Sequence, residues 1–175
     1  MEDGKMNINA KIGWHAGMEL TAQTFIELDK NLDRQQQITR RIANGGDFGI
    51  IPAAPFHCQG AFVKKTLEIT PLTFMALLPS GRILHVDENV VLDIPILYGK
   101  EYYLGCRQSD NMRAFDKERV PFVSPVPSCG IYTLDELEKD DILPLMKFKV
   151  DDGMFSVDRD YLPPYLMLES DERFQ

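Results

Sequence analysis

The chain has 175 residues, 44% of them hydrophobic and 26% charged, and its formal net charge is −8. This length and apolar content fit one globular domain, so we expect a single domain over residues 1–175. The acidic balance and the lack of a basic stripe argue against nucleic-acid binding. No run of about 18 apolar residues and no signal peptide is present, so we expect a cytoplasmic protein that does not insert into a membrane.

The first predicted element is a long helix over residues 21–44. Neither Pro nor Gly interrupts it, Thr21 is a suitable N-cap, and Asn44 followed by two glycines ends it. Apolar residues recur at helical spacing, but three successive glutamines interrupt them. These apolar residues are Phe25, Leu28, Leu32, Ile38 and Ile42. Because the apolar face is narrow, we expect the helix to lie on a surface.

After Gly46, short apolar or alternating runs between turn residues predict β-strands. They cover residues 48–52, 66–78, 90–97, 102–107, 121–123, 145–149 and 154–157. The run over residues 66–78 is expected to be interrupted near Pro71. Strands of this length and spacing indicate a mainly β fold, either a sandwich or a barrel.

Three local signals refine this pattern. The Pro79-Ser80-Gly81 turn predicts a tight hairpin between two apolar runs. Thr133 followed by Glu136 is a capping box and indicates a short helical turn over residues 133–139. Residues 161–166 are expected to be extended, because their two prolines disfavour helical geometry.

The cysteines give no sign of a catalytic or disulfide framework. Cys58, Cys106 and Cys129 are odd in number and far apart, which favours free thiols in a reducing compartment. His57 beside Cys58 could supply a base and a nucleophile, but neighbouring residues in a strand point to opposite faces. We therefore expect Cys58 to be a buried thiol beside a solvated histidine.

Other reactive patterns are equally weak. The three histidines, His15, His57 and His85, have no metal-ligand spacing. Acidic pairs such as Asp87-Glu88 and Asp140-Asp141 lack the pattern of a calcium loop and are interpreted as solvated turns. Ser80 and Ser128 lie outside any nucleophile-elbow motif, and small polar residues of this kind suit turns. No glycine-rich phosphate loop occurs. We expect a protein that is not an enzyme and needs neither a cofactor nor a metal.

The most specific pattern lies where a tryptophan-containing turn meets the long helix. Trp14 is the lone tryptophan, and either core packing or an interface contact would suit it. The segment resembles the motif W-x-x-G-M-x-L-x-P-Q-H-F-Q that opens the TssK family of type VI secretion system baseplate proteins. The matching residues are Trp14, Gly17, Met18, Leu20, Gln23 and Phe25.

The resemblance continues along the chain, thinly in the middle. Phe48-Gly49-Ile50, Leu78-Pro79-Ser80-Gly81 and Leu162-Pro163-Pro164 are similar to later steps of the family pattern. The chain departs from the motif at Ala22, where the family usually has Pro, and at Thr24, where it has His. It also departs at Ile26, where the family has Gln, and at Ala16, where an acidic residue is common. These differences suggest a distant branch.

The resemblance implies a β-sandwich similar to the shoulder domain of phage receptor-binding proteins, with the helix packed on it. It implies that the family's helical stalk and C-terminal head are absent and that the full-length protein is a trimer. The expected partners are TssF- and TssG-like wedge proteins, which the adaptor links to the membrane complex. The residues expected to anchor the domain or contact partners are Trp14, Gly17, Met18, Leu20, Gln23, Phe25, Leu28, Leu32, Pro163 and Pro164.

Two other hypotheses have different signatures. A carbohydrate-binding β-sandwich would use Tyr102, Tyr103 or Tyr161 as a stacking platform in a concave pocket with convergent polar groups. A thiol-dependent enzyme would need an ionisable Cys58 within reach of a histidine nitrogen.

Overall fold

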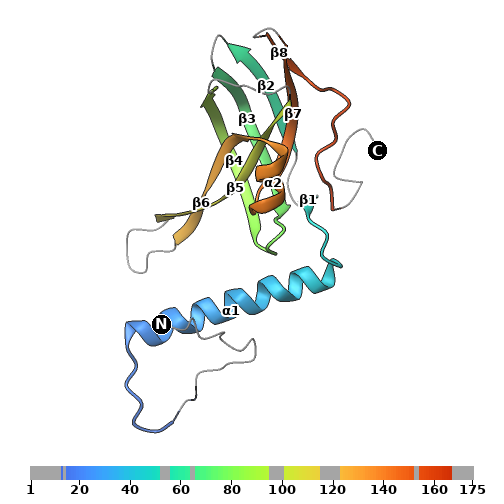
Figure 1. Cartoon of the computed structure of the whole chain (residues 1–175). Coiled ribbons are helices and arrows are strands. Elements are labelled where there is room, and N and C mark those ends of the chain that lie inside the picture. Colours follow the sequence, from blue (N-terminus) through green and yellow to red (C-terminus); the bar gives the residue numbers. More distant parts are fainter. Residues whose placement is uncertain are drawn as a thin grey trace. The chain divides into compact units, whose positions relative to one another are not determined.

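The computed structural model describes residues 13, 15–51, 56–63, 66–94, 101–114, 123–151 and 154–166. The chain forms two compact units, Met1–Gly46 and Asp47–Gln175. Each unit has its own secondary structure, and together they contain one long helix and two β-sheets (Figure 1). The predicted mainly β class with a long N-terminal helix is confirmed.

The first unit contains helix α1 (Ala22–Ala43). Thr21 is its N-cap, because the Thr21 hydroxyl accepts a hydrogen bond from the Thr24 amide at 3.3 Å. At the other end the Asn44 amide donates to the Arg40 carbonyl at 3.1 Å. Gly45 and Gly46 follow with φ of 63° and 89°, which ends the helix. The predicted helix is therefore confirmed, with the predicted caps.

The second unit begins with a four-stranded antiparallel sheet. It contains β1 (Gly49–Ile51), β2 (His57–Val63), β3 (Thr66–Leu77) and β4 (Ile83–Asp93). Strand β3 is central and pairs with β4 along one edge. Along its other edge β3 pairs with β2 over residues 66–73 and with β1 over residues 75–77. The predicted hairpin joins β3 to β4, and the predicted interruption near Pro71 appears as a register shift between Ile69 and Leu72. Both predictions are confirmed.

The second sheet is also antiparallel and four-stranded. Its order is β6 (Val123–Tyr132), β5 (Glu101–Ala114), β7 (Leu143–Asp151) and β8 (Met154–Val157). Between β6 and β7 lies the short helix α2 (Leu134–Lys139). Its predicted capping box is present, with Glu136 accepting from the Thr133 amide at 2.7 Å and from the Thr133 hydroxyl at 2.8 Å.

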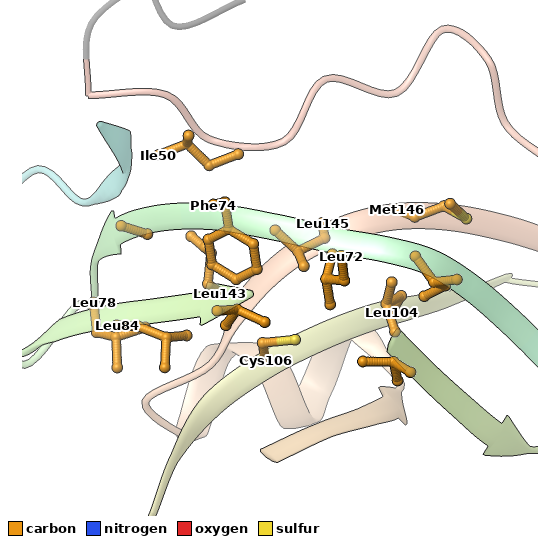
Figure 2. Packing of buried hydrophobic residues seen from close by; sticks show 14 of the residues in the cluster. Ile50, Leu72, Phe74, Leu78, Leu84, Leu104, Cys106, Leu143, Leu145 and Met146 are labelled. Carbon is orange, nitrogen blue, oxygen red and sulfur yellow. The ribbon is translucent and has the colours of Figure 1, made fainter. Parts of the chain in front are cut away.

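The core lies between the two sheets, which makes the second unit a β-sandwich. Apolar side chains from β3 and β4 meet side chains from β5 and β7, and Figure 2 shows them pointing toward one another. The largest of these buried side chains include Phe74, Leu72, Leu104 and Leu143. At one side of the sandwich the ring of Phe62 on β2 stacks on Phe155 of β8, with centroids 5.0 Å apart. Burial of apolar side chains from both layers holds the sandwich together.

Four strands differ from the sequence prediction. Strand β2 was not predicted, and β5 continues to Ala114, beyond the predicted residues 102–107. Strand β4 continues through Asp87 and Glu88, which were interpreted as a turn. Apolar residues on both sides of the pair, Val86 and Val90, are buried and keep the strand on the core. Strand β6 extends to Tyr132, whereas only residues 121–123 were predicted. Ser128 therefore lies in a strand and not in a turn.

The prediction of three free thiols is wrong. Cys106 on β5 and Cys129 on β6 are register partners and form a disulfide. Antiparallel pairing places the two residues directly opposite each other, at a Cα–Cα distance of 4.2 Å. Cys58 is the free cysteine of the described chain.

Candidate functional site

The predicted interaction residues of the first unit lie in the turn before α1 and along its first half. Gly17 has φ of 82°, and the Met18 amide donates to the His15 carbonyl at 3.2 Å. Residues 15–18 therefore form a turn shortly before the N-cap, Thr21. Gln23 donates to Glu27 at 2.8 Å along the helix surface. Trp14 lies outside the described residues. Whether Trp14 packs in a core or contacts a partner therefore remains untested.

The apolar residues of α1 are accessible. The exposed fraction is 54% for Phe25 and 48% for Leu32, and no described residue of α1 is buried. Leu20, just before the N-cap, is 58% exposed. Phe25, Leu28 and Leu32 are spaced by three and four residues, which places them on one face of the helix. We call these three residues the α1 stripe. Leu28 is half-buried between the exposed Phe25 and Leu32.

Other residues of α1 lie away from this stripe. Ile26 follows Phe25 directly, so it projects about 100° around the helix from Phe25. Its exposed fraction, 48%, equals that of Leu32. We also predict from the sequence that the turn and the start of the helix are locked onto the sandwich by Trp14, Met18, Leu20 and Phe25. This concerns contact between the two units and stays a prediction.

Pro163 and Pro164 lie in an extended segment that pairs with β1. The Ile50 amide donates to the Pro164 carbonyl at 2.8 Å, and the Leu166 amide donates to the Ile50 carbonyl at 2.9 Å. Pro163 is buried. Gly49 permits this approach, because a Cβ at that position would lie 2.6 Å from the Pro164 carbonyl oxygen. Backbone hydrogen bonds of Pro164 and Leu166 therefore hold this segment on β1.

Cys58 has the environment of a structural thiol. It packs against the core cluster, and burial raises its pKa to about 12. The thiol is then protonated near neutral pH, whereas a nucleophilic cysteine needs the thiolate. Exposed and half-buried residues alternate along β2, so exposed His57 and half-buried Cys58 face opposite sides. The chemistry of a thiol-dependent enzyme is absent from this pair.

No group of three or more His, Cys, Asp or Glu side chains suited to a metal ion occurs within the described ranges. His57 and His85 lie on β2 and β4, which are separated by β3. Asp140 and Asp141 lie in the bend after α2, as predicted. There Asp141 accepts a hydrogen bond from the Ser80 amide at 2.8 Å and thereby links the β3–β4 turn to the start of β7.

The tyrosines of the carbohydrate hypothesis belong to the packing of the second sheet. Tyr102 and Tyr103 are 7% and 8% exposed, and the Tyr102 ring stacks on Phe148. Tyr161 meets the Tyr103 ring edge-on, and burial raises its pKa to about 12. Rings committed to such contacts do not offer an open stacking platform.

A groove of about 250 Å³, with both polar and apolar side chains in its walls, lies elsewhere, between the edge strands of the two sheets. Its first wall is the hairpin side of β4, with Ile83, His85, Asp87 and Glu88. Its second wall consists of Gln108 and Arg113 of β5 and the Pro125-Val126-Pro127 run of β6. We call it the β4–β6 groove. Sequence reasoning missed it, because its walls come from strands far apart in the chain and Asp87-Glu88 was interpreted as a turn.

Within the described residues, no helix is both long enough and apolar enough to cross a membrane. No protein-family model matches the chain, and no curated protein matches it. The fold is similar to that of a chain in the cryo-electron microscopy structure of the type VI secretion system TssK-TssF-TssG baseplate subcomplex. The TM-score is 0.58 at 13% sequence identity, and the match covers 95% of this chain and 65% of that chain. This chain thus shares the fold of a baseplate component and spans about two thirds of its length.

Proposed function

We propose that this chain is a structural component of a bacterial type VI secretion baseplate, equivalent to the shoulder domain of a TssK-type adaptor. The observation that carries the proposal is the fold match over 95% of the chain with a TM-score of 0.58. The residue pattern from Gly17 to Phe25 supports it independently of the structure. The proposed partners are TssF- and TssG-like wedge proteins, and the proposed location is the bacterial cytoplasm. The full-length adaptor would be a trimer that also reaches the membrane complex.

The proposed work of the domain is adhesion. The α1 stripe offers apolar side chains that are about half exposed, as with Phe25 and Leu32. Burying such side chains against a partner supplies roughly 25 cal/mol per Å² of apolar surface. A few aromatic and aliphatic anchors usually dominate the binding energy of an interface. In a trimer, three copies of a modest site would add avidity without any new contact.

The proposal is tested by measuring binding of the purified chain to a reconstituted TssF–TssG-like wedge complex from the same bacterium. The informative variant combines Phe25→Ala with Leu32→Ala on the α1 stripe. We expect a loss of about 2 kcal/mol or more, roughly thirtyfold in Kd or greater, because two interface anchors are removed. The free chain should change little in stability, since both side chains are exposed and Ala favours a helix.

The matched control is Ile26→Ala, which removes an equally exposed side chain from another face of the same helix. It should bind the wedge complex like the unaltered chain. If the double variant binds as tightly as this control, the α1 stripe is not the contact surface. If the unaltered, folded chain shows no affinity for the wedge complex, the proposed function itself is wrong.

A further inference from the structure

The disulfide between Cys106 and Cys129 fastens an edge strand of the sandwich. Among the described strands, β6 pairs with β5 alone, so it forms one edge of the second sheet. The two cysteines are register partners with a Cα–Cα distance of 4.2 Å, close to the distance of about 4.5 Å in a non-hydrogen-bonded pair. The backbone hydrogen bonds therefore belong to the pairs on either side. These are Gly105–Gly130 and Arg107–Ser128.

Both redox states of the two cysteines suit this position. Cys106 belongs to the buried core cluster, and half-buried Cys129 packs against it. Free thiols suit such apolar surroundings, because cysteine packs as a small hydrophobe. The hydrogen-bonded pairs on either side keep the two residues opposite each other when the S–S bond is open. The bond can therefore break and re-form without a change of register.

Thiol–disulfide exchange opens the bond from its exposed side. Cys106 is 0% exposed, whereas Cys129 keeps part of its surface accessible, so we expect an attacking thiolate to reach Cys129. A cellular dithiol would form a mixed disulfide with Cys129 and displace Cys106 as a thiolate, which takes up a proton. Its second thiol, as a thiolate, would then release Cys129 in the same way. The chain gains two electrons and two protons, and the reductant becomes a disulfide. A disulfide oxidant such as oxidised glutathione reverses the exchange.

Opening the bond loosens one wall of the β4–β6 groove. Gln108 and its register partner Pro127 lie two residues from the cysteine pair. Gln108 donates its Nε2 hydrogen to the Ile83 carbonyl oxygen of β4 at 2.8 Å, and Pro127 lines the groove. Beyond them the β5–β6 register shifts between Gln108 and Met112, and such an irregularity disrupts the ladder locally. The disulfide therefore fastens β6 beside a place where backbone pairing is interrupted.

The cellular environment decides which state prevails. Glutathione and thioredoxin-type proteins keep cytosolic thiols reduced, and the disulfides that occur there are usually transient and catalytic or redox-sensing. We propose that Cys106 and Cys129 form a reversible redox switch, which a cellular dithiol opens and a disulfide oxidant closes. The closed state fastens β6 to β5, and the open state lets β6 and its wall of the β4–β6 groove detach more often. That the open state prevails in growing cells rests on the proposed function, whereas the switch itself does not.

Amide hydrogen exchange of the full chain, purified with the disulfide intact, tests the switch. The Ser128 and Gly130 amides report on the attachment of β6, because their pairs carry the hydrogen bonds to β5. After dithiothreitol is added, we expect their exchange to accelerate by about tenfold or more relative to protected amides of β7. Oxidised glutathione should restore the slow exchange. Equal rates in both states, or an acceleration no larger than that in β7, would overturn the proposal.

Two single variants separate the pair from the third cysteine. Cys129→Ala removes the bond, so its β6 amides should exchange like those of the reduced chain whether or not dithiothreitol is present. Cys58→Ala is the matched control, because it removes the free thiol and leaves the pair intact. It should switch like the unaltered chain. A Cys129→Ala chain that exchanges as slowly as the oxidised chain, or a Cys58→Ala chain that no longer switches, would overturn the proposal.

Thiol trapping in the bacterium supplies a test that needs no Cys129 variant. Cells that carry the Cys58→Ala chain are quenched with acid, and the denatured chain is labelled with a maleimide mass tag. Because two cysteines remain, we expect two tags per chain in growing cells and none after exposure to the thiol oxidant diamide. Two tags should return after recovery. Two tags at every stage would overturn the proposal, because the cysteines would then be packed thiols only.

The switch and the proposed function can fail separately. If the purified chain switches but its pair stays bonded in growing cells, the proposed cytoplasmic location is wrong and the switch stands. If the chain switches but does not bind the wedge complex, the proposed function fails alone. If it binds the wedge complex but its β6 amides do not respond to dithiothreitol, the switch fails alone.

Discussion

Gly49→Ala tests how the end of the described chain is held on the sandwich. Gly49 has φ of 148°, a conformation that residues with a side chain rarely adopt. A Cβ there would lie 2.6 Å from the Pro164 carbonyl oxygen and 2.9 Å from the Leu166 amide nitrogen. These are backbone atoms and cannot rotate away. The substitution should therefore strain β1 or displace residues 164–166.

The magnitude follows from these two effects. A residue forced into a sparsely populated conformation costs about 1–3 kcal/mol. Displacing the segment breaks the two hydrogen bonds between Ile50 and residues 164 and 166, each worth about 0.5–1.5 kcal/mol net. The protein either keeps the strain or gives up the two hydrogen bonds, and either cost is about 1–3 kcal/mol, so we expect a loss of about 1–3 kcal/mol in the free energy of unfolding.

Urea denaturation followed by circular dichroism measures this loss as a shift in midpoint at constant slope. Gly60→Ala is the control within the same unit, because its added Cβ would press only on the flexible ends of Leu67 and Met146, at 3.1 and 3.2 Å, and would be in ordinary contact with Ile69 at 3.6 Å. That change should cost less than about 1.5 kcal/mol. A midpoint shift for Gly49→Ala no larger than that for Gly60→Ala would mean that the close approach of residues 164–166 does not require glycine at position 49.

Three further predictions concern the second sheet. Gly105→Ala should lower the free energy of unfolding by about 1–3 kcal/mol in a thermal melt, because its Cβ would crowd Ile142 and Tyr132; an unchanged Tm would contradict this. Hydrogen bonds from Thr133 lower the pKa of Glu136 below its ordinary value. The ionised carboxylate therefore stabilises the fold above the ordinary carboxyl pKa, and this stabilisation is lost as pH falls through the lowered pKa. The stability gap between the unaltered chain and Glu136→Gln should therefore shrink on acidification, and a gap that is constant with pH would argue against the capping box. Mass spectrometry after alkylation of the denatured chain should find one labelled cysteine before reduction and three after it. Three labelled cysteines before reduction would contradict the disulfide.

Local signals in the sequence were sufficient for α1 and α2. The Thr21 hydroxyl and the Gly45–Gly46 pair act on the backbone within a few residues, so the helix ends can be predicted without tertiary information. The same holds for the β3–β4 hairpin, whose turn closes between Leu78 and Arg82.

Features that depend on strand pairing could not be predicted in this way. Strand β6 contains Pro125 and Pro127, which indicate a turn unless the strand is known to lie at a sheet edge. The disulfide depends on the register that places Cys106 opposite Cys129, and a sequence separation of 23 carries no information on register. The β4–β6 groove likewise requires three strands to be in place before His85 and Pro125 lie on facing walls.

The proposed function is that this chain holds baseplate proteins together. Affinity purification of the tagged protein from its own bacterium, followed by mass spectrometry of what co-purifies, tests it most directly. We expect TssF- and TssG-like proteins in near-stoichiometric amounts, and smaller amounts when Phe25 and Leu32 are both replaced by Ala. A folded chain that recovers neither wedge protein would contradict it.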